Sequence, residues 1–231
     1  MKGMNTAMAM NLCRLVAAGL AVLALGGCSA LRPAATPPPA FYSLDRLNGA
    51  RPVSSAATTA PTLVISPPRA AAGFDSQRII YLRERHKLDY FAHSEWVDPP
   101  ARMLGPLLVA AIQNSGAFHA VVLTPGSAAG DLRLDTEIVR LQHEFLGSPS
   151  RVRFTLRATL VADRTRRVLA WREFDGYVEA ASEDPYGGVV AANRVVQTVL
   201  EQLSDFCGEA ARSASFNAST SPPYPSSLES Q

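Results

Sequence analysis

"RVRFTLRATLVAD", residues 151–163, shows the clearest alternation of apolar and polar side chains in this sequence. Because successive side chains of a β-strand point to opposite faces, this period of two predicts a strand with one buried face. The predicted buried face consists of Val152, Phe154, Leu156, Ala158 and Leu160. The opposite face would carry Arg151, Arg153, Thr155, Arg157 and Thr159. The stretch therefore predicts a sheet with one side in the core and the other in water or against a partner.

Other stretches extend this sheet on both sides. Residues 131–145 alternate at Leu132 and Leu134 and then change phase toward Val139 and Leu141, which predicts a β-bulge. Residues 77–96 read as two strands around a polar turn near Arg85-His86. Further strands are predicted at 62–66, 120–124 and 168–180.

Two helices are predicted among these strands. Asp98 followed by two prolines indicates a helix start with a side-chain cap, and Gly116 would end that helix. Its apolar positions are Met103, Leu107, Leu108, Ala111 and Ile112. Asp184-Pro185 would open a last helix running to about Arg212, with an apolar stripe of Val189, Val196, Val199, Leu200, Leu203 and Phe206. This order predicts an α+β fold: a mainly antiparallel sheet with two helices packed on one face.

The N-terminal 27 residues read as a signal peptide. A weakly basic start is followed by the apolar stretch at 15–25, which is shorter than the roughly 20 residues of a membrane span. Leu25, Gly26 and Gly27 then precede Cys28 in a pattern that resembles the bacterial lipobox. Signal peptidase II would recognise these three residues and cleave before Cys28. The alternative is an ordinary secretory signal or a short membrane helix with an incidental cysteine.

Small residues are expected before this cysteine because bulky side chains at Gly26 and Gly27 would obstruct the peptidase that cleaves there. Cys28 would receive an S-diacylglycerol group and, after cleavage, an N-acyl chain such as palmitate, which together form a stable anchor. No other cofactor is expected. Ser29 is not the Asp that often retains lipoproteins at the inner membrane, so we expect an outer-membrane anchor facing the periplasm.

The part after Cys28 divides by composition. Residues 28–40 comprise the lipidated cysteine and a proline-rich tether, which could span about 35 to 40 Å. Residues 41–213 would form one folded domain, and the Ser- and Pro-rich residues 214–231 a disordered tail. Cys207 is the one cysteine within that domain, so no internal disulfide is expected there, and the surrounding pattern favours a buried thiol.

Charge and motifs argue against several classes of function. Removing Lys2 and Arg14 with the signal leaves as many basic as acidic side chains, so nucleic acid is not an expected partner. The sequence contains no phosphate-binding loop and no G-x-S-x-G motif. Its four histidines lack metal-ligand spacing, so neither a metal site nor an enzyme is expected. Candidate partner-binding residues are Arg151, Arg153, Arg157, Tyr90 and Trp96, against the plainer interpretation of a solvated arginine face and core aromatics.

The sequence resembles the ABC-type transport auxiliary lipoprotein family. The resemblance rests on the lipobox, "FYSL" at 41–44, "TLVISPP" at 62–68 and "GFDSQRIIYLRERHKLDYFAHSEWVDPPARML" at 73–104. Its specific positions are Phe41, Tyr42, Leu44, Tyr81, Arg83, Leu88, Tyr90 and Trp96. Pro99-Pro100 departs from the family, in which a Leu often follows the Trp.

The resemblance implies a non-catalytic component of an envelope lipid transport system. Such systems are similar to the paraquat-inducible machines and contain an ATPase, a permease and a substrate-binding protein of the mammalian-cell-entry type. The lipoprotein would dock that periplasmic protein, and assembly into a homo-oligomer is left open. The alternative is an envelope lipoprotein that activates or scaffolds a cell-wall synthesis complex.

Overall fold

The computed structural model describes residues 10, 14, 38–45, 59–126 and 129–220, with side chains as far as Ser213. The chain divides into two units, Met1–Pro38 and Pro39–Gln231. All elements discussed below belong to the second. Apart from residues 10 and 14, the predicted signal peptide with its lipobox lies outside the described residues, as does most of the tether.

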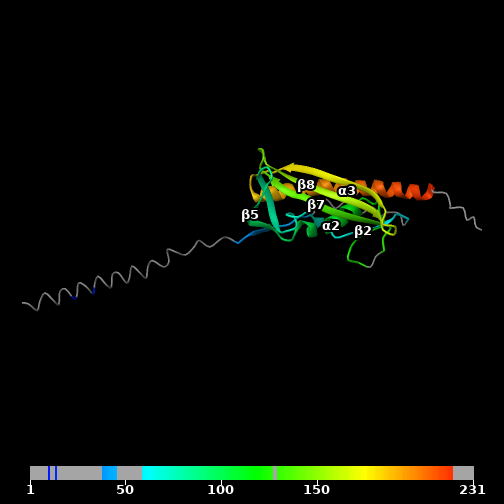
Figure 1. Cartoon of the computed structure of the whole chain (residues 1–231), viewed down its shortest axis with the longest axis horizontal. Helices are drawn as coiled ribbons and strands as arrows, with labels where there is room; N and C mark the ends of the chain where they lie inside the picture. Colours follow the sequence, from blue (N-terminus) through cyan, green and yellow to red (C-terminus); the bar gives the residue numbers. More distant parts are fainter. Residues whose placement is uncertain (1–9, 11–13, 15–37, 46–58, 127–128, 221–231) are drawn as a thin grey trace, which may run out of the picture. The chain divides into compact units, whose positions relative to one another are not determined.

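Within the described part of the folded unit there are a nine-stranded sheet and two helices, which confirms the α+β class (Figure 1). The strands are β1 (Ala40–Tyr42), β2 (Thr62–Ile65), β3 (Arg69–Ala70), β4 (Arg78–Glu84), β5 (Lys87–Trp96), β6 (Ala120–Leu123), β7 (Leu132–Glu144), β8 (Arg151–Ala162) and β9 (Val168–Glu179). The helices are α2 (Pro100–Asn114) and α3 (Pro185–Thr220).

The sheet is mixed, and its longest pairings, β4–β5, β7–β8 and β8–β9, are antiparallel, as predicted. β7, β8 and β9 form an antiparallel meander, as the sequence predicted. The opposite edge of β7 pairs in parallel with β2, β3 and β4, each along a different part of its length. β1 joins β5 and β6 joins β2, also in parallel. Parallel neighbours need long crossovers, and α2 supplies the one that leads to β6.

The burial pattern of β8 agrees with the alternation of its sequence. The five apolar residues of β8 are buried, Phe154, Leu156, Ala158 and Leu160 completely, while Arg157 on the opposite face is exposed. Thr155 differs: it lies on the outer face but is buried, and its hydroxyl donates a hydrogen bond to Asp175 Oδ1. The register of β7 shifts between Ile138 and Arg140, which confirms the predicted bulge.

Both helices lie against the inner face of the sheet. α3 packs along β7, β8 and β9, and α2 packs on β3, β6 and α3. The apolar stripe predicted for α3 is buried throughout. Asp184 caps α3 by accepting a hydrogen bond from the Gly187 amide at 2.7 Å. The helix continues to Thr220, past its predicted end near Arg212, because no Gly or Pro interrupts it there. Residues 221–231 of the predicted tail lie outside the described residues.

Two details of α2 differ from the prediction. Asp98 does not cap the helix, because Pro99 occupies the N-cap position, and the Asp98 carboxylate pairs with Arg102 at 3.3 Å instead. The fully buried positions are Leu104, Leu108 and Ile112, whereas the predicted positions Met103, Leu107 and Ala111 are only partly buried. Since α2 is covered by both the sheet and α3, its buried arc is wider than one amphipathic stripe and is centred elsewhere.

The close approach of α3 to β9 gives a prediction for Gly176. A Cβ atom at this position would lie 3.1 Å from Val195 Cγ2 and 3.2 Å from Val199 Cγ2. We expect Gly176→Val to lower the free energy of unfolding by about 1–3 kcal/mol through overpacking, measured by urea denaturation. Gly147→Ala is the matched control, because nothing lies within 4 Å of its Cβ position. Equal effects of the two substitutions would contradict the close packing.

Candidate docking face

The outer face of the β7–β9 meander carries the three arginines singled out from the sequence. Arg151, Arg153 and Arg157 project from β8, as the alternation requires. In register with them lie Glu144 and Glu137 on β7, and Tyr177 and Glu173 on β9. Their cross-strand neighbours are therefore mainly carboxylates, with an aromatic ring at one edge.

Ion pairs neutralise this arginine row. Arg153 binds Asp175 with two nitrogens, Nε to Oδ1 at 2.9 Å and Nη2 to Oδ2 at 2.7 Å. Arg157 bridges Glu137 at 3.1 Å and Glu173 at 3.0 Å. Hydrogen bonding from Arg153 lowers the pKa of Asp175, and the same contact raises the pKa of Arg153. Both groups therefore stay charged together, and the row is not a free cationic patch.

Glu144, the last residue of β7, lies beside Arg151 at the end of the arginine row. This buried carboxylate accepts hydrogen bonds from Arg151 Nε at 3.0 Å and from Gln142 Nε2 at 2.8 Å. The Arg151 guanidinium also lies over the ring of Tyr177, 4.9 Å from its centroid. The arginine thus links a buried carboxylate to an exposed aromatic ring.

β9 adds two exposed aromatics that the sequence analysis did not single out. Trp171 is 67% exposed and Tyr177 62% exposed. They lie on the outer face because they are in register with Thr159 and Arg153 of β8. Extending the alternation of β8 across the hairpin would have found them. Among the strands of the described residues, β9 pairs with β8 alone, so its outer backbone edge is unpaired.

The two predicted aromatic candidates lie elsewhere. Trp96, at the end of β5, is 3% exposed and belongs to the core, so it cannot contact a partner. Tyr90 is half exposed and lies under the Arg78 guanidinium, 4.2 Å from its ring centroid. The structure therefore brings the arginines together with Trp171 and Tyr177, and not with Tyr90 or Trp96.

A buried Ser–His pair is also present. His143 Nε2 lies 2.8 Å from Ser150 Oγ, and both residues are almost completely buried. Glu183 accepts a hydrogen bond from the Ser150 amide at 2.8 Å, so this carboxylate is bonded to the serine. His143 Nδ1 is a buried nitrogen without a partner. Burial lowers the pKa of His143, which keeps the imidazole neutral. Because the carboxylate does not orient the histidine and the serine is inaccessible, the arrangement does not match a nucleophilic triad.

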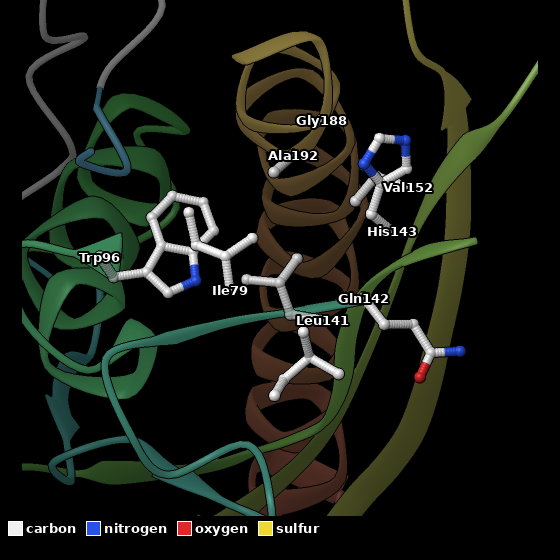
Figure 2. A pocket seen from close by; sticks show the side chains of 9 residues that line it. Ile79, Trp96, Leu141, Gln142, His143, Val152, Gly188 and Ala192 are labelled. Carbon is white, nitrogen blue, oxygen red and sulfur yellow. The ribbon is translucent and has the colours of Figure 1, made fainter. Parts of the chain in front are cut away.

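A small pocket adjoins this pair. Figure 2 shows the His143 ring beside Gly188 at the start of α3, while Gln142 points away from the helix. A Cβ on Gly188 would collide with the His143 ring, so the glycine is required for the ring to fit. The pocket is lined by Ile79, Ile80, Trp96, Leu141, Gln142, His143, Val152, Gly188 and Ala192. This lining is mostly apolar.

The described residues were also compared with the requirements of a membrane-spanning helix, a metal site and a reactive thiol. Of the helices in the described ranges, none is both long and apolar enough to cross a bilayer. Within the same ranges, no cluster of three or more His, Cys, Asp or Glu residues is arranged to hold a metal ion. Cys207 is buried as predicted, and burial raises the pKa of its thiol to about 12, which makes the thiol unreactive at neutral pH.

Two crystal structures are similar to the folded unit of this chain. A crystal structure of a Xanthomonas campestris protein from family DUF330 has a TM-score of 0.68 and 22% identity, covering 77% of this chain and 99% of that one. A crystal structure of an uncharacterized protein has a TM-score of 0.54 and 14% identity, covering 74% and 97%. These two likenesses support the fold. No curated protein sequence matches the chain.

The model of the family described as "ABC-type transport auxiliary lipoprotein component" matches residues 42–204. This range extends from the end of β1 into α3 and includes the whole outer face. The match thus covers most of the chain and nearly all of its folded part. The chain belongs to the ABC-type transport auxiliary lipoprotein family.

Proposed function

We propose that the protein is a non-catalytic, outer-membrane lipoprotein of an ABC-type intermembrane lipid transport system of the mammalian-cell-entry type. It is anchored through N-acyl and S-diacylglycerol lipids on Cys28 and faces the periplasm. Its folded unit docks the periplasmic substrate-binding component, which works with the permease and ATPase of that system. Family membership supports the association with ABC-type transport, and the lipobox supports the anchor.

The exposure of Trp171 and Tyr177 on an edge strand carries the docking part of the proposal. Large aromatics contribute most of the energy of many protein interfaces, and such residues are normally buried. The neighbouring arginines are already paired with carboxylates, so a partner would meet a neutral polar surround rather than an anion-binding patch. An unpaired strand edge also allows a partner to add its own backbone hydrogen bonds.

The buried polar groups support a non-catalytic role. His143 and Ser150 are the pair that most resembles catalytic residues, and both are closed off by β7, β8 and the start of α3. Glu183 binds the serine side of the pair, which leaves the histidine without an orienting carboxylate. These groups act as a structural link between the β7–β8 hairpin and α3.

Co-purification tests the docking proposal. The lipoprotein and its mammalian-cell-entry partner should copurify from detergent-solubilised membranes. The double substitution Trp171→Ala/Tyr177→Ala should weaken this association at least about 30-fold, because truncation of an interface aromatic costs about 2 kcal/mol or more. Binding is measured by titration of the purified components.

Tyr186→Ala is the matched control for this experiment. Tyr186 is 63% exposed, close to the value for Tyr177, but it lies at the start of α3 and not on the outer face. We expect it to leave the affinity unchanged. If the double variant bound the partner with unchanged affinity, the outer face would be ruled out as the docking site. Copurification with peptidoglycan synthases instead of transport components would favour the cell-wall alternative.

A further inference from the structure

The end of the folded unit that holds the start of α3 exposes several large apolar side chains. β1 is the first strand after the tether, and its Tyr42 ring lies 6.4 Å from that of Tyr186 at the start of α3. The same end holds the β4–β5 hairpin and the 145–150 loop (Figure 1). Exposed large apolar residues at the hairpin and the loop are Leu88, Tyr90 and Leu146. Phe41 and Val97 are also exposed and lie at the other end of β5, where β1 pairs with it, and Tyr186 lies at the start of α3. At the opposite end, the turn between β8 and β9 has Val168 and Trp171.

The hairpin and the loop form one continuous tip. The Phe145 amide donates a hydrogen bond to the Leu82 carbonyl at 2.7 Å, which joins the loop to β4. The rings of Tyr81, Phe91 and Phe145 pack together, with Tyr81 and Phe91 centroids 4.6 Å apart. The Arg83 guanidinium lies over Tyr81 and Phe145 at 5.6 and 5.4 Å from their centroids. We call this surface, residues 81–91 and 145–147, the tip.

The composition of the tip is typical of a membrane–water interface. In and beside its turn, the tip has three basic residues, Arg83, Arg85 and Lys87, and two acidic residues, Glu84 and Asp89. Outside the tip, Arg78 lies beside Tyr90 and adds one more cation. Leu88 is 47% exposed and Leu146 46% exposed. The loop "FLGSPS" at 145–150 has no charged residue. Leu88 and Tyr90 alternate with Phe91 along β5, so they lie on the face of the hairpin opposite Tyr81 and Phe91. Exposed leucines in a segment that also has aromatic and basic residues are the combination that interfacial membrane segments use.

We propose that the tip rests on the surface of the bilayer that anchors the protein, with Leu88 and Leu146 in the interfacial layer and the basic side chains against anionic phospholipid headgroups. This inference rests on the proposed lipid anchor at Cys28. The tether of 28–39 precedes β1, and its reach of about 35 to 40 Å exceeds the roughly 20 Å of strand between Leu88 and Ser94, where β1 pairs with β5. The tether is therefore long enough for the tip to reach the membrane in which the lipid is anchored.

A fluorophore at the tip tests this contact. The full lipidated chain carries Leu88→Cys, labelled with an environment-sensitive dye, in vesicles of phosphatidylethanolamine and phosphatidylglycerol. Cys207 does not compete for the dye because it is buried with a pKa of about 12. Lipids with a quencher near the headgroup should quench this dye strongly. Val168→Cys is the matched control: Val168 is 55% exposed at the start of β9, next to the other turn, and its dye should not be quenched.

The charge contribution is tested in the same background. Arg85→Gln/Lys87→Gln should lower the ratio of contacting to free tip by about fivefold per lost charge in phosphatidylglycerol vesicles. The same substitutions should have no effect in phosphatidylcholine vesicles. Raising the salt concentration should reproduce the effect of the substitutions.

Two separate measurements test the lipid anchor and the membrane contact of the tip. Flotation of the vesicles reports anchoring independently of the dye. If the chain floats with the vesicles but the L88C and V168C labels respond alike, the tip proposal is overturned, and a protein partner becomes the occupant of the tip. If the chain does not float, the anchor fails, and the dye is then read with the chain added to excess vesicles. Lack of quenching at the L88C label there overturns the tip as well.

Discussion

Replacing Phe154 with alanine is expected to lower the free energy of unfolding by about 3–5 kcal/mol. The Phe154 ring is fully buried in the middle of β8. Its strand neighbours are Leu141 on β7 and Gly176 on β9, and the valines of α3 already press against Gly176. The surrounding side chains therefore have little room to collapse into the cavity, which puts the cost in the upper range for large-to-small substitutions.

Urea denaturation followed by circular dichroism measures this loss. Thr159→Ala is the control on the same strand, because Thr159 is on the outer face and only partly buried. We expect its effect to be below about 1 kcal/mol. A loss of less than 1 kcal/mol for Phe154→Ala would show that the packing between β8 and α3 is looser than the structure describes.

Replacing Cys28 with alanine is expected to abolish lipid attachment completely. In the proposed anchor, the diacylglyceryl group would be attached to the thiol, which alanine lacks, and cleavage by signal peptidase II would follow that attachment. The variant should therefore keep its 27-residue signal peptide and run as a precursor. Metabolic labelling with a fatty acid and intact-mass measurement report both changes.

Cys207→Ala is the control for this prediction. Its thiol is buried in α3, so removing it should leave lipid attachment and cleavage unchanged. If the Cys28→Ala variant were anchored in the membrane normally, the lipobox interpretation would be wrong. The docking proposal could then still hold, because the outer face belongs to the folded unit and does not depend on the lipid.

Much of the secondary structure could be predicted because its signals are local. The strand at 151–162 follows from strict alternation, and the bulge near Val139 follows from one change of phase. The start of α3 after Asp184 follows from a cap and a proline. The cap predicted at Asp98 was wrong because two successive prolines moved the N-cap position by one residue. Local rules are sensitive to such shifts of register.

The candidate site was predicted only in part. Alternation placed Arg153 and Arg157 on the outer face, but it could not show that Asp175 and Glu173 neutralise them. These pairs depend on the register between β8 and β9, and the turn between the strands did not specify it. Trp96 was a surface candidate until the packing of β1, β5 and α2 showed that it belongs to the core.

The sequence by itself determined most of the strands and both helices, although not β1 and β3, and it determined which face of β8 is apolar. It also shows that the residues before Cys28 resemble a lipobox. Each of these depends on residues close together in the chain. Only the tertiary structure decided that β2, β3 and β4 lie parallel to β7, that the arginine row is neutralised, and that the β4–β5 hairpin and the 145–150 loop form one tip with exposed leucines. The reason is physical: alternation defines the two faces of a strand, whereas its neighbours are selected by hydrogen bonding and packing between residues far apart in the sequence.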